Sequence, residues 1–433
     1  MKKIGIRYED KFTVERRVPL IPEHVKKLNQ EFSIEFNVEP SEKRIYKDEE
    51  FIKAGANLTG DFSDCELIIG VKEIVEKWFE DEKTYIFFSH TIKGQDYNMG
   101  ILRKMIEKKV NLIDYEKIAD ENDKRLIFFG KFAGLAGMID TIWSLGLRLK
   151  HQGIENPFTK LNQCYTYNSL EEAKAVVREI GEDIKKNGLP KELTPFVTGF
   201  TGYGNVSIGS QEIYDLLPVK EITPAELIEL ENKTDLPNNL LYKVVFKEKD
   251  LSVRKDGTPF ELQHYYNNPA DYKSDFEQYL PKMSVLMNCM YWTEDYPTIV
   301  TKDYLEKNYN NDHSLKIIGD ITCDVNGSIE CTEKGALVEN PIFVYDTKNN
   351  TIEDGYKGDG IQMMTVDILP SELPREASDF FSSALLPFIP LIAKADFNVP
   401  FEELDIPAPI KRALILHKGK FTPKYKYMKE FLK

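Results

Sequence analysis

The chain has 433 residues, of which 42% are hydrophobic, 12% aromatic and 30% charged, so it is long enough to form two domains with substantial cores. Its formal net charge of -14 argues against a nucleic-acid partner, because binding to a phosphate backbone requires a basic surface. In such an acidic protein, an anionic substrate must be bound by a local cluster of basic side chains.

The sequence contains no evident secretion signal or membrane anchor. The amino terminus MKKIGIRYED has no apolar core of roughly 7 to 15 residues, and no run of about 18 apolar residues is present. We therefore expect a cytoplasmic protein without a membrane partner. The cysteines lack CxxC spacing and are interpreted as buried free thiols: Cys65, Cys164, Cys289, Cys323 and Cys331. Most histidines show no metal-ligand spacing, so we expect no metal site: His24, His151, His264, His313 and His417.

Strand and helix patterns alternate over the first 130 residues. The strand patterns lie at 3–8, 33–38, 65–71, 84–89 and 111–115, and helical patterns begin at Pro22 and cover 47–56 and 98–110. Short apolar strands separated by helices predict a parallel sheet covered by helices on both faces.

Polar side chains follow three of these strands, at the edge where parallel sheets bind ligands. Lys72 and Glu73 follow one strand, His90 follows the next and Glu116 follows the third. Burial lowers the pKa of a lysine and histidine titrates near neutrality, so Lys72 and His90 form a candidate proton-transfer pair. The alternative is a solvated strand-end lysine beside a loop histidine without a role.

Several basic residues are candidates for binding carboxylates. A guanidinium offers two parallel donors and an ammonium offers a point charge. These candidates are Arg16, Arg17, Lys93 and Arg125. Each is otherwise interpreted as an ordinary surface residue.

A second alternating domain is expected to begin near residue 134. Residues 132–150 predict a long helix with small residues at its start, and a polar helix follows at 169–188. Later strands are expected at 217–222, 316–324 and 363–370, and a helix over 374–395 should break at Pro387 or Pro390. Residues 232–310 give no assignment, apart from a solvated loop expected at 247–257.

The segment 195–213, PFVTGFTGYGNVSIGSQEI, predicts a dinucleotide site. Gly202 permits a tight strand-to-helix turn, Gly204 lets backbone amides approach a diphosphate, and the helix amino terminus favours negative charge. The expected contacts come from Gly202, Tyr203, Gly204, Asn205 and Val206. The pattern departs from the usual fingerprint, because Ser207 stands where a third glycine or alanine is expected, with Gly209 two residues later.

Two aspartates follow the strand expected at 316–324. In a dinucleotide-binding domain, Asp320 and Asp324 would face the nicotinamide half of the ligand. The alternative is a turn-forming pair ahead of Asn326 and Gly327.

Several motifs together resemble the lysine-ketoglutarate reductase family, the lysine-forming saccharopine dehydrogenases found as the amino-terminal half of bifunctional aminoadipic semialdehyde synthases. That family is similar in turn to alanine dehydrogenase and to transhydrogenase amino-terminal domains. The motifs follow the family's order: ERRVPLIPEHV (15–25), LIIGVKE (67–73), FFSHTIKGQ (87–95), LIDYEKI (112–118), FAGLAGMIDT (132–141), FTGYGNVSIGSQEIYDLLP (200–218), GDITCDVNGSIE (319–330) and VDILPSELPREAS (366–378).

The resemblance implies an α/β fold of two Rossmann-like, doubly wound parallel-sheet domains, with a cleft between them and long helices linking them. Residues 1–133 plus 371–433 would form the substrate-binding domain and 134–370 the dinucleotide-binding domain. The implied reaction condenses L-lysine with 2-oxoglutarate and reduces the imine to saccharopine.

The resemblance also implies roles for the candidate residues. Lys72 and His90 would be the acid–base pair, with Glu73 and Glu116 tuning them. Arg17, Lys93 and Arg125 would bind the carboxylates of saccharopine.

The sequence leaves the cofactor and some alternatives open. The family favours NADP(H), but NAD(H) is also possible, because neither Glu221 nor Thr223 at the expected second strand decides. The competing functions are reductive amination of a small keto acid by ammonia, as in alanine dehydrogenase, and nucleotide sensing without turnover. A homo-oligomer and a separate saccharopine-cleaving dehydrogenase are the expected protein partners.

Overall fold

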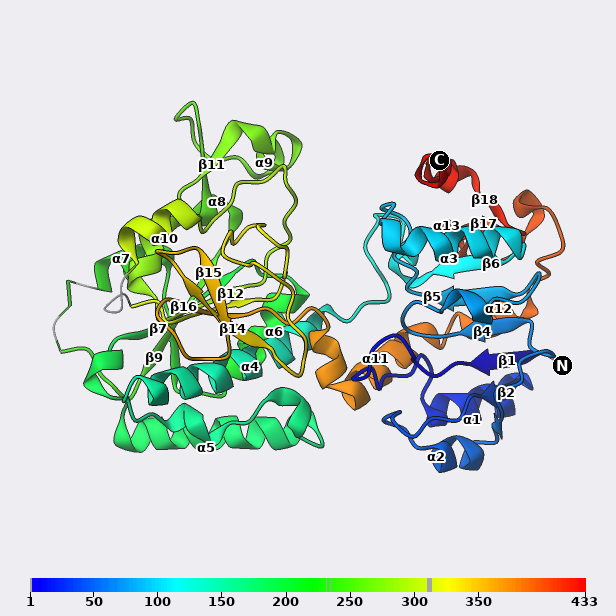
Figure 1. Cartoon of the computed structure of the whole chain (residues 1–433), viewed down its shortest axis with the longest axis horizontal. Helices are drawn as coiled ribbons and strands as arrows, with labels where there is room; N and C mark the ends of the chain where they lie inside the picture. Colours follow the sequence, from blue (N-terminus) through cyan, green and yellow to red (C-terminus); the bar gives the residue numbers. More distant parts are fainter. Residues whose placement is uncertain (1, 231, 234, 310–313) are drawn as a thin grey trace. The chain divides into compact units, whose positions relative to one another are not determined.

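The computed structural model describes residues 2–230, 232–233, 235–309 and 314–433, so His313 lies outside the described residues. The chain divides into two compact units (Figure 1). The first unit comprises the residues up to Phe129 together with Pro374–Lys433, and the second is Gly130–Leu373. The sequence analysis predicted the first division at 133/134, four residues after its place in the structure. It predicted the second at 370/371, three residues before its place in the structure. Within the described ranges, no helix combines the length and apolar character needed to cross a membrane.

The first unit contains one sheet with the strand order β18-β17-β6-β5-β4-β1-β2-β3. The strands β6, β5, β4, β1, β2 and β3 are parallel, and β17 and β18 are antiparallel additions at one edge. The order changes direction between β1 and β4, as in a doubly wound sheet. The strands are β1 (Lys3–Ile6), β2 (Glu35–Val38), β3 (Asn57–Leu58), β4 (Leu67–Ile69), β5 (Thr84–Phe87), β6 (Asn111–Asp114), β17 (Leu414–His417) and β18 (Lys420–Phe421).

Alternate strand residues of the first sheet face two separate cores. Ile86 and Ile113 pack in a core with α1, α2, α11, α12 and α13, whereas Tyr85 and Leu112 pack in a core with α3. Both faces of the sheet are therefore covered, which explains why the strands are apolar throughout. The helices are α1 (Pro22–Phe32), α2 (Asp48–Lys53), α3 (Asp96–Glu107), α11 (Pro374–Leu385), α12 (Ile389–Lys394) and α13 (Ala408–Ala413).

The second unit contains a sheet with the order β15-β14-β16-β13-β12-β7-β9-β8. The strands β16, β13, β12, β7, β9 and β8 are parallel, and β14 and β15 are antiparallel additions at one edge. Its strands are β7 (Phe196–Thr201), β8 (Val219–Glu221), β9 (Leu241–Phe246), β12 (Val285–Asn288), β13 (Ile317–Asp320), β14 (Ile342–Asp346), β15 (Thr351–Asp354) and β16 (Ile361–Met364). A separate hairpin is formed by β10 (Ser252–Arg254) and β11 (Tyr272–Ser274). The prediction of two doubly wound α/β domains is confirmed at the level of the fold of each unit.

The long helices of the second unit follow the sequence prediction. The helix expected at 132–150 is α4 (Gly130–His151), and the helix expected at 169–188 is α5 (Leu170–Asn187). The hydroxyl of Ser169 caps α5 at one end, and Gly188, with φ of 74°, ends it at the other. The remaining helices of this unit are α6 (Asn205–Tyr214), α7 (Pro224–Leu230), α8 (Glu248–Leu251), α9 (Leu262–Asn267) and α10 (Lys302–Asn308).

One expectation for the second unit is wrong, and another is confirmed as a strand but not as the neighbour of the glycine-turn strand. Residues 247–257 are not a simple surface loop, because they form α8 and β10. The strand predicted at 217–222 is β8, but β8 lies at the sheet edge and β9 lies beside β7. Glu221 and Thr223 therefore do not follow the strand next to the glycine turn.

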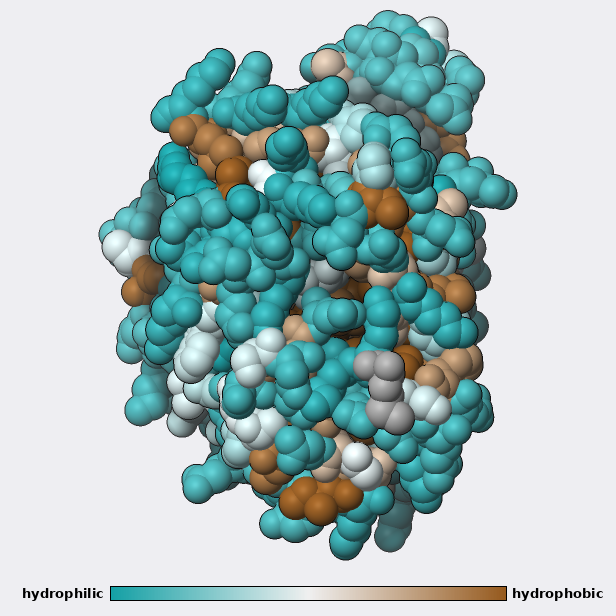
Figure 2. Space-filling view, turned by 90° about the vertical axis from the view of Figure 1, so that its right-hand side faces the viewer, coloured by the Kyte–Doolittle hydropathy of each residue, from teal (hydrophilic) through white to brown (hydrophobic). Residues whose placement is uncertain are grey.

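The face of the molecule in Figure 2 is mostly hydrophilic, and hydrophobic residues appear on it only in small separate patches. Scattered apolar residues of this kind are ordinary for a protein surface facing water.

Two carboxyl groups are buried together in the second unit. Asp140 of α4 and Glu372, at the end of the 3-10 helix Leu369–Glu372, are 0% and 2% exposed and interact directly. Their outer oxygens accept hydrogen bonds from the backbone of Cys164 (2.7 Å) and Tyr165 (3.1 Å). Burial raises the pKa of Asp140 to about 7, and burial together with the charge of Asp140 raises the pKa of Glu372. The pair therefore retains a proton near neutral pH.

Because of this pair, we expect the free energy of unfolding to fall as the pH rises. The folded chain keeps a proton that the unfolded chain releases above about pH 4, so the unfolding free energy should decrease between about pH 4 and pH 7, by up to about 1.4 kcal/mol per pH unit. Urea unfolding of Asp140→Asn at several pH values should give a clearly smaller slope, because an amide donates to Glu372 without carrying a proton to lose. The exposed Glu229→Gln in α7 is the control and should keep the wild-type slope. Equal slopes for Asp140→Asn and wild type would contradict this account.

Candidate functional site

The carboxyl edge of the first sheet gathers the polar residues predicted from the sequence. Lys72 and Glu73 follow β4, His90 follows β5 and Glu116 follows β6. The structure adds Glu9, which follows β1 and is 7% exposed. Four adjacent parallel strands thus deliver ionisable groups to one edge, where ligands of such sheets bind.

Glu73 is the centre of this cluster. Its Oε1 lies 2.8 Å from Nδ1 of His90 and accepts a hydrogen bond from Nζ of Lys11 at 2.5 Å. Although burial opposes ionisation, the hydrogen bond and charge of His90, together with the bond from Lys11, lower the pKa of Glu73 to about 2. Its Oε2 is buried without a hydrogen-bond partner among the described residues. Glu73 is therefore ionised at neutral pH and presents its negative charge to Nδ1 of His90 and Nζ of Lys11.

The backbone of His90 contributes to this geometry. His90 has a φ of 47°, in the left-handed region, and its carbonyl accepts a hydrogen bond from Asn98 of α3 at 3.1 Å. Such a conformation costs about 1 kcal/mol and persists where its surroundings hold it. In this conformation Nδ1 of the imidazole is hydrogen-bonded to Oε1 of Glu73, and Nε2 is the second ring nitrogen.

Buried Asp114, the last residue of β6, aligns the neighbouring strand ends. Its carboxylate accepts hydrogen bonds from the backbone and hydroxyl of Ser89 and, at 2.8 Å, from the backbone of Glu116. The side chain of Glu116 pairs with Arg125, whose side chain is 51% exposed. This contact brings two of the predicted substrate-binding residues together.

Arg17 and Lys93 have very different surroundings. Arg17 is 3% exposed, pairs with buried Glu15 through two of its nitrogens and lies 4.3 Å from the ring centroid of Phe129. The charge of Arg17 lowers the pKa of Glu15 against the effect of burial. Lys93, in contrast, is exposed. Arg17 is thus already neutralised by a partner that the sequence analysis did not identify.

The glycine turn of the second unit fits a dinucleotide diphosphate. Gly202 has a φ of 78° and Gly204 caps α6, which begins at Asn205. A Cβ added to Gly204 would meet no atom within 4 Å, so this side of the backbone is open to a ligand. The first amides of α6 point from the helix amino terminus, which favours an anion. The predicted contact residues Tyr203, Asn205 and Val206 are exposed or half-buried.

Glycines at the contact between α4 and α6 replace the missing third glycine of the fingerprint. A Cβ at Gly134 would lie 1.9 Å from the carbonyl oxygen of Val206, and one at Gly209 would lie 2.1 Å from that of Lys131. Ser210 also donates a hydrogen bond to the carbonyl of Gly134 at 3.0 Å. The close helix packing that the fingerprint needs therefore occurs against α4, and the small, buried Ser207 is accommodated.

Asp320 and Asp324 are in different environments. Asp320 is 0% exposed, and its carboxylate accepts hydrogen bonds from Asn288, Thr322 and Thr332. Burial raises its pKa despite these bonds. Asp320 ties together the carboxyl ends of β12 and β13, whereas Asp324 is exposed. Of the two aspartates, only Asp324 presents its side chain to solvent.

A second group of polar residues lies beside the glycine turn and was missed in the sequence. The backbone of Gly202 donates to the carbonyl of Phe246, the last residue of β9. Glu248 accepts hydrogen bonds from the hydroxyls of Tyr203, at 3.1 and 3.2 Å, and Tyr266, at 2.7 Å. Lys247 is exposed, with Nζ 5.8 Å from the centroid of the Tyr203 ring. No strand was predicted at β9, so no signal pointed to Lys247, Glu248 or Tyr266, whereas Tyr203 was already an expected contact.

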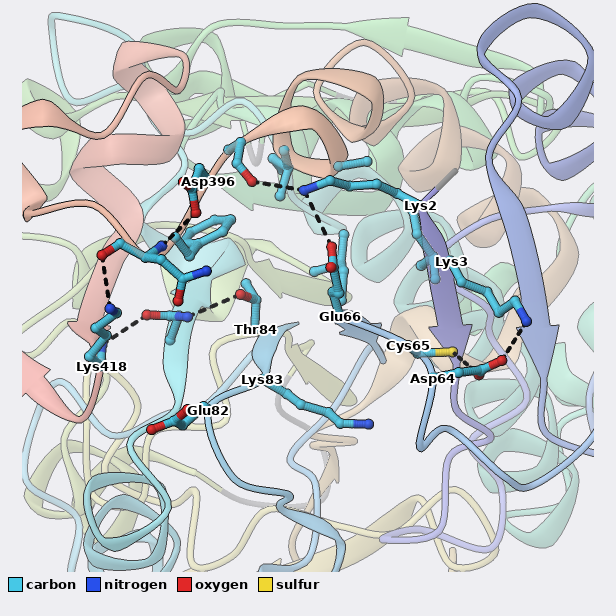
Figure 3. Close-up of a pocket in the computed structure, with 18 of the residues that line it drawn as sticks. Lys2, Lys3, Asp64, Cys65, Glu66, Glu82, Lys83, Thr84, Asp396 and Lys418 are labelled. Carbon is cyan, nitrogen blue, oxygen red and sulfur yellow. Dashed lines mark hydrogen bonds and ion pairs between the residues drawn. The ribbon is translucent and has the colours of Figure 1, made fainter.

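The first unit also has a cavity of about 330 Å³ at the opposite edge of its sheet (Figure 3). Its lining includes Lys3, Leu67, Thr84 and Asn111, which begin β1, β4, β5 and β6. Charged groups around it pair with each other, including Lys2 with Glu66 and Lys3 with Asp64. Because parallel sheets bind ligands at their carboxyl ends, this cavity is not the candidate site. Among the described residues, no three His, Cys, Asp or Glu side chains are grouped to hold a metal ion.

Comparisons with known proteins identify relatives of the chain. Residues 5–136 match the family model of the alanine dehydrogenase/PNT, N-terminal domain. The chain is 38% identical over 441 residues to the alpha-aminoadipic semialdehyde synthase of Arabidopsis thaliana, which covers 98% of this chain and 41% of that protein. It is 26% identical over 407 residues to the NAD(+), L-lysine-forming saccharopine dehydrogenase of Yarrowia lipolytica, covering 91% of this chain and 93% of that one. The chain is a homologue of both enzymes.

These relatives confirm the family resemblance inferred from the motifs. The chain spans less than half the length of the Arabidopsis synthase. Among solved structures, an L-alanine dehydrogenase matches with a TM-score of 0.62 at 16% identity, covering 100% of both chains. That likeness concerns the fold, and a nicotinamide cofactor is implied by the homologous dehydrogenases.

Replacing Gly204 with valine should separate ligand binding from folding. The backbone at Gly204 is extended (φ -78°, ψ -170°) and its Cβ direction is open, so Gly204→Val should change the unfolding free energy by less than about 1 kcal/mol. The added side chain would keep a diphosphate from the amides of α6, so dinucleotide affinity should fall more than roughly tenfold. Urea unfolding and a fluorescence titration with NADPH and NADH measure the two effects. Gly209→Val, which meets the backbone of α4, should instead destabilise the protein. Unchanged dinucleotide affinity in Gly204→Val would rule out this turn as the binding site.

Proposed function

We propose that this chain condenses L-lysine with 2-oxoglutarate and reduces the imine with NAD(P)H to saccharopine, or catalyses the reverse reaction. The observation that carries the proposal is the His90–Glu73–Lys11 cluster beside Lys72, in a chain homologous along its length to a lysine-forming saccharopine dehydrogenase. A nicotinamide cofactor would supply the hydride.

The acid–base roles follow from the chemistry of imine formation. The ε-amine of lysine must lose a proton before it attacks the keto carbon, and the resulting hydroxyl must gain a proton before it leaves as water. We assign these transfers to Lys72 and His90. Ionised Glu73 orients the imidazole of His90 through Nδ1, and Nε2 would exchange a proton with substrate.

The carboxylates of saccharopine need cationic partners. Lys93 and the half-exposed Arg125 are accessible for this role, and Glu116 holds Arg125 in place. Arg17 would act from a buried position, with Glu15 fixing its orientation. In the second unit, the glycine turn and Asp324 would contact the dinucleotide, whereas Asp320 would support the strand ends from within.

The alternatives from the sequence have less support. Reductive amination of a small keto acid by ammonia is suggested by the family model over residues 5–136 and by a fold likeness at 16% identity. A non-catalytic sensor would not need the buried, ionised Glu73 beside His90, because burying a charge without function is costly. Oligomeric state, a separate saccharopine-cleaving partner and cytoplasmic location stay predictions.

The proposal is tested by assaying purified protein for NADPH and NADH oxidation that depends on both L-lysine and 2-oxoglutarate, with the product identified by mass. His90→Asn and Lys72→Met should each lower kcat by about 10²- to 10⁴-fold, because each removes a proton-transfer group. His151→Asn, a change of an exposed histidine in α4, should keep wild-type activity. Oxidation of cofactor with pyruvate and ammonia in the absence of lysine would favour the alanine dehydrogenase alternative instead.

Within this proposal, we favour NADP(H) over NAD(H) because of Lys247. In a dinucleotide-binding sheet, the adenosine ribose lies at the end of the strand beside the glycine-turn strand, which here is β9. The hydroxyls of Tyr203 and Tyr266 donate hydrogen bonds to the carboxylate of Glu248. Exposed Lys247 supplies a positive charge near the ring of Tyr203. An ammonium suits the 2'-phosphate of NADP(H).

Lys247→Ala should therefore weaken binding of 2',5'-ADP roughly tenfold and leave 5'-AMP binding unchanged, since only the former carries the 2'-phosphate. Isothermal titration of both nucleotides measures this without relying on turnover. Lys249→Ala, an exposed lysine two residues further along, is the control. Tighter binding of NADH than NADPH by wild type, unaffected by Lys247→Ala, would overturn the preference.

A further inference from the structure

Glu9 occupies a special position in the first sheet. It follows β1, and β1 lies beside β4 at the place where the strand order changes direction. The last ladder bond between these strands is donated by the backbone of Arg7 to the carbonyl of Ile69, at 3.0 Å. The paired register of the two strands ends at Ile6 and Ile69, and Glu9, beyond that end, is 7% exposed.

The carboxylate of Glu9 binds two consecutive backbone amides beyond the end of β4. Oε1 accepts a hydrogen bond from the amide of Val71 at 2.6 Å, and Oε2 accepts one from the amide of Lys72 at 2.8 Å. On the other side, the carbonyl of Val71 accepts a bond from the amide of Phe88 at 2.9 Å. The main chain that carries Lys72 is therefore fixed between β1 and β5, with a side chain replacing the strand partner that the sheet no longer provides.

We propose that Glu9 is a positioning residue whose carboxylate, by holding the main-chain amides of Val71 and Lys72, sets the place of the Lys72 side chain at the substrate edge. The inference rests on the proposed function, because Lys72 matters only if it transfers protons there. It names a residue that no motif in the sequence indicated.

The hydrogen bonds from the Val71 and Lys72 amides to Glu9 depend on pH, because Glu9 must be ionised to accept both. Burial, followed by the charge of Glu15, raises the pKa of Glu9 to about 7, while the two amide bonds and Arg17 act in the opposite direction. Tyr115, which follows β6, is fully buried, and the charge of Glu9 adds to the effect of burial in raising its pKa. Lys72 itself acts electrostatically on Glu15. When Glu9 gains a proton below about pH 7, one oxygen becomes a donor and faces an amide that also donates, so the hold weakens.

Two substitutions separate the hold from general packing. In Glu9→Gln, the side chain keeps its size but presents an NH2 group to one of the two amides, so one hydrogen bond is lost. Glu9→Asp keeps the carboxylate and shortens its reach. The matched control is Glu39→Gln, because Glu39 follows the neighbouring β2, is 8% exposed and bonds to Arg7 and the backbone of Tyr8 instead.

The test combines amide hydrogen exchange with kinetics on the full chain. Glu9→Gln should raise the exchange rates of the Val71 and Lys72 amides by about tenfold or more while those of β4 keep their wild-type rates, and it should lower kcat by about tenfold with little change in the KM for the cofactor. The wild-type Lys72 amide should lose protection between pH 8 and pH 6, after correction for intrinsic exchange, and Glu9→Gln should remove that dependence. Glu39→Gln should show none of these changes.

The outcomes distinguish this inference from the proposed function. Wild type without lysine-dependent reductase activity would refute the proposed function, and the exchange measurements would still show whether Glu9 holds Lys72. Unchanged exchange at Val71 and Lys72 in Glu9→Gln would overturn the inference whatever the activity. Faster exchange with unchanged kcat would show a structural contact without a positioning role. Should Glu9→Gln fail to fold, Glu9→Asp applies the same criteria, with faster exchange and lower kcat expected together.

Discussion

Two helices of the second unit, α4 and α6, approach so closely that neither Gly134 nor Gly209 could carry a side chain. Added Cβ atoms at Gly134 of α4 and Gly209 of α6 would lie 1.9 and 2.1 Å from a backbone oxygen of the other helix, far inside van der Waals contact distance. Because α4 begins the unit and α6 begins at the glycine turn, this contact fixes the direction in which the amides of α6 point. The orientation of the glycine turn thus depends on a helix that begins some seventy residues earlier in the chain.

The carboxyl edges of the two sheets provide different kinds of partner for their buried carboxylates. Buried polar groups at strand ends need partners, since an unpaired one costs several kcal/mol. In the second unit, hydroxyl and amide side chains surround Asp320, so its carboxylate braces the strands and leaves Asp324 at the surface. In the first unit, Oε1 of Glu73 contacts the ionisable side chains of His90 and Lys11. The first edge therefore pairs ionisable side chains with one another, whereas the second surrounds its carboxylate with neutral donors.

The sequence predicted what depends on local pattern. Helices α4 and α5, and the break between α11 and α12 near Pro387, follow from apolar periodicity, capping residues and proline. Strand β9 was missed because its apolar residues lie within a polar stretch and the strand is only six residues long. The edge position of β8 could not be predicted, because pairing between parallel strands depends on contacts far apart in sequence.

The candidate site was predictable to a similar extent. Residues that directly follow strands, such as Lys72, Glu73 and His90, were found by one rule, and the same rule applied to the first strand would have indicated Glu9. The contact of Lys11 with Glu73 joins residues 62 apart, so only the folded chain reveals it. The pairing of Arg17 with Glu15 depends on burial, which the motif does not report.

Two carboxyl groups at the first edge differ in acidity because of their surroundings rather than their residue type. Burial opposes ionisation of both, but His90 and Lys11 lower the pKa of Glu73 to about 2. Burial and the charge of Glu15 instead raise the pKa of Glu9 to about 7, against the effect of its two amide bonds. Both flank Lys72, one as the next residue and the other through its amide. Near neutral pH, Glu73 therefore keeps a fixed charge while Glu9 changes its own. Environments that push the pKa values of neighbouring carboxyls apart are how one edge can both hold a charge and exchange a proton.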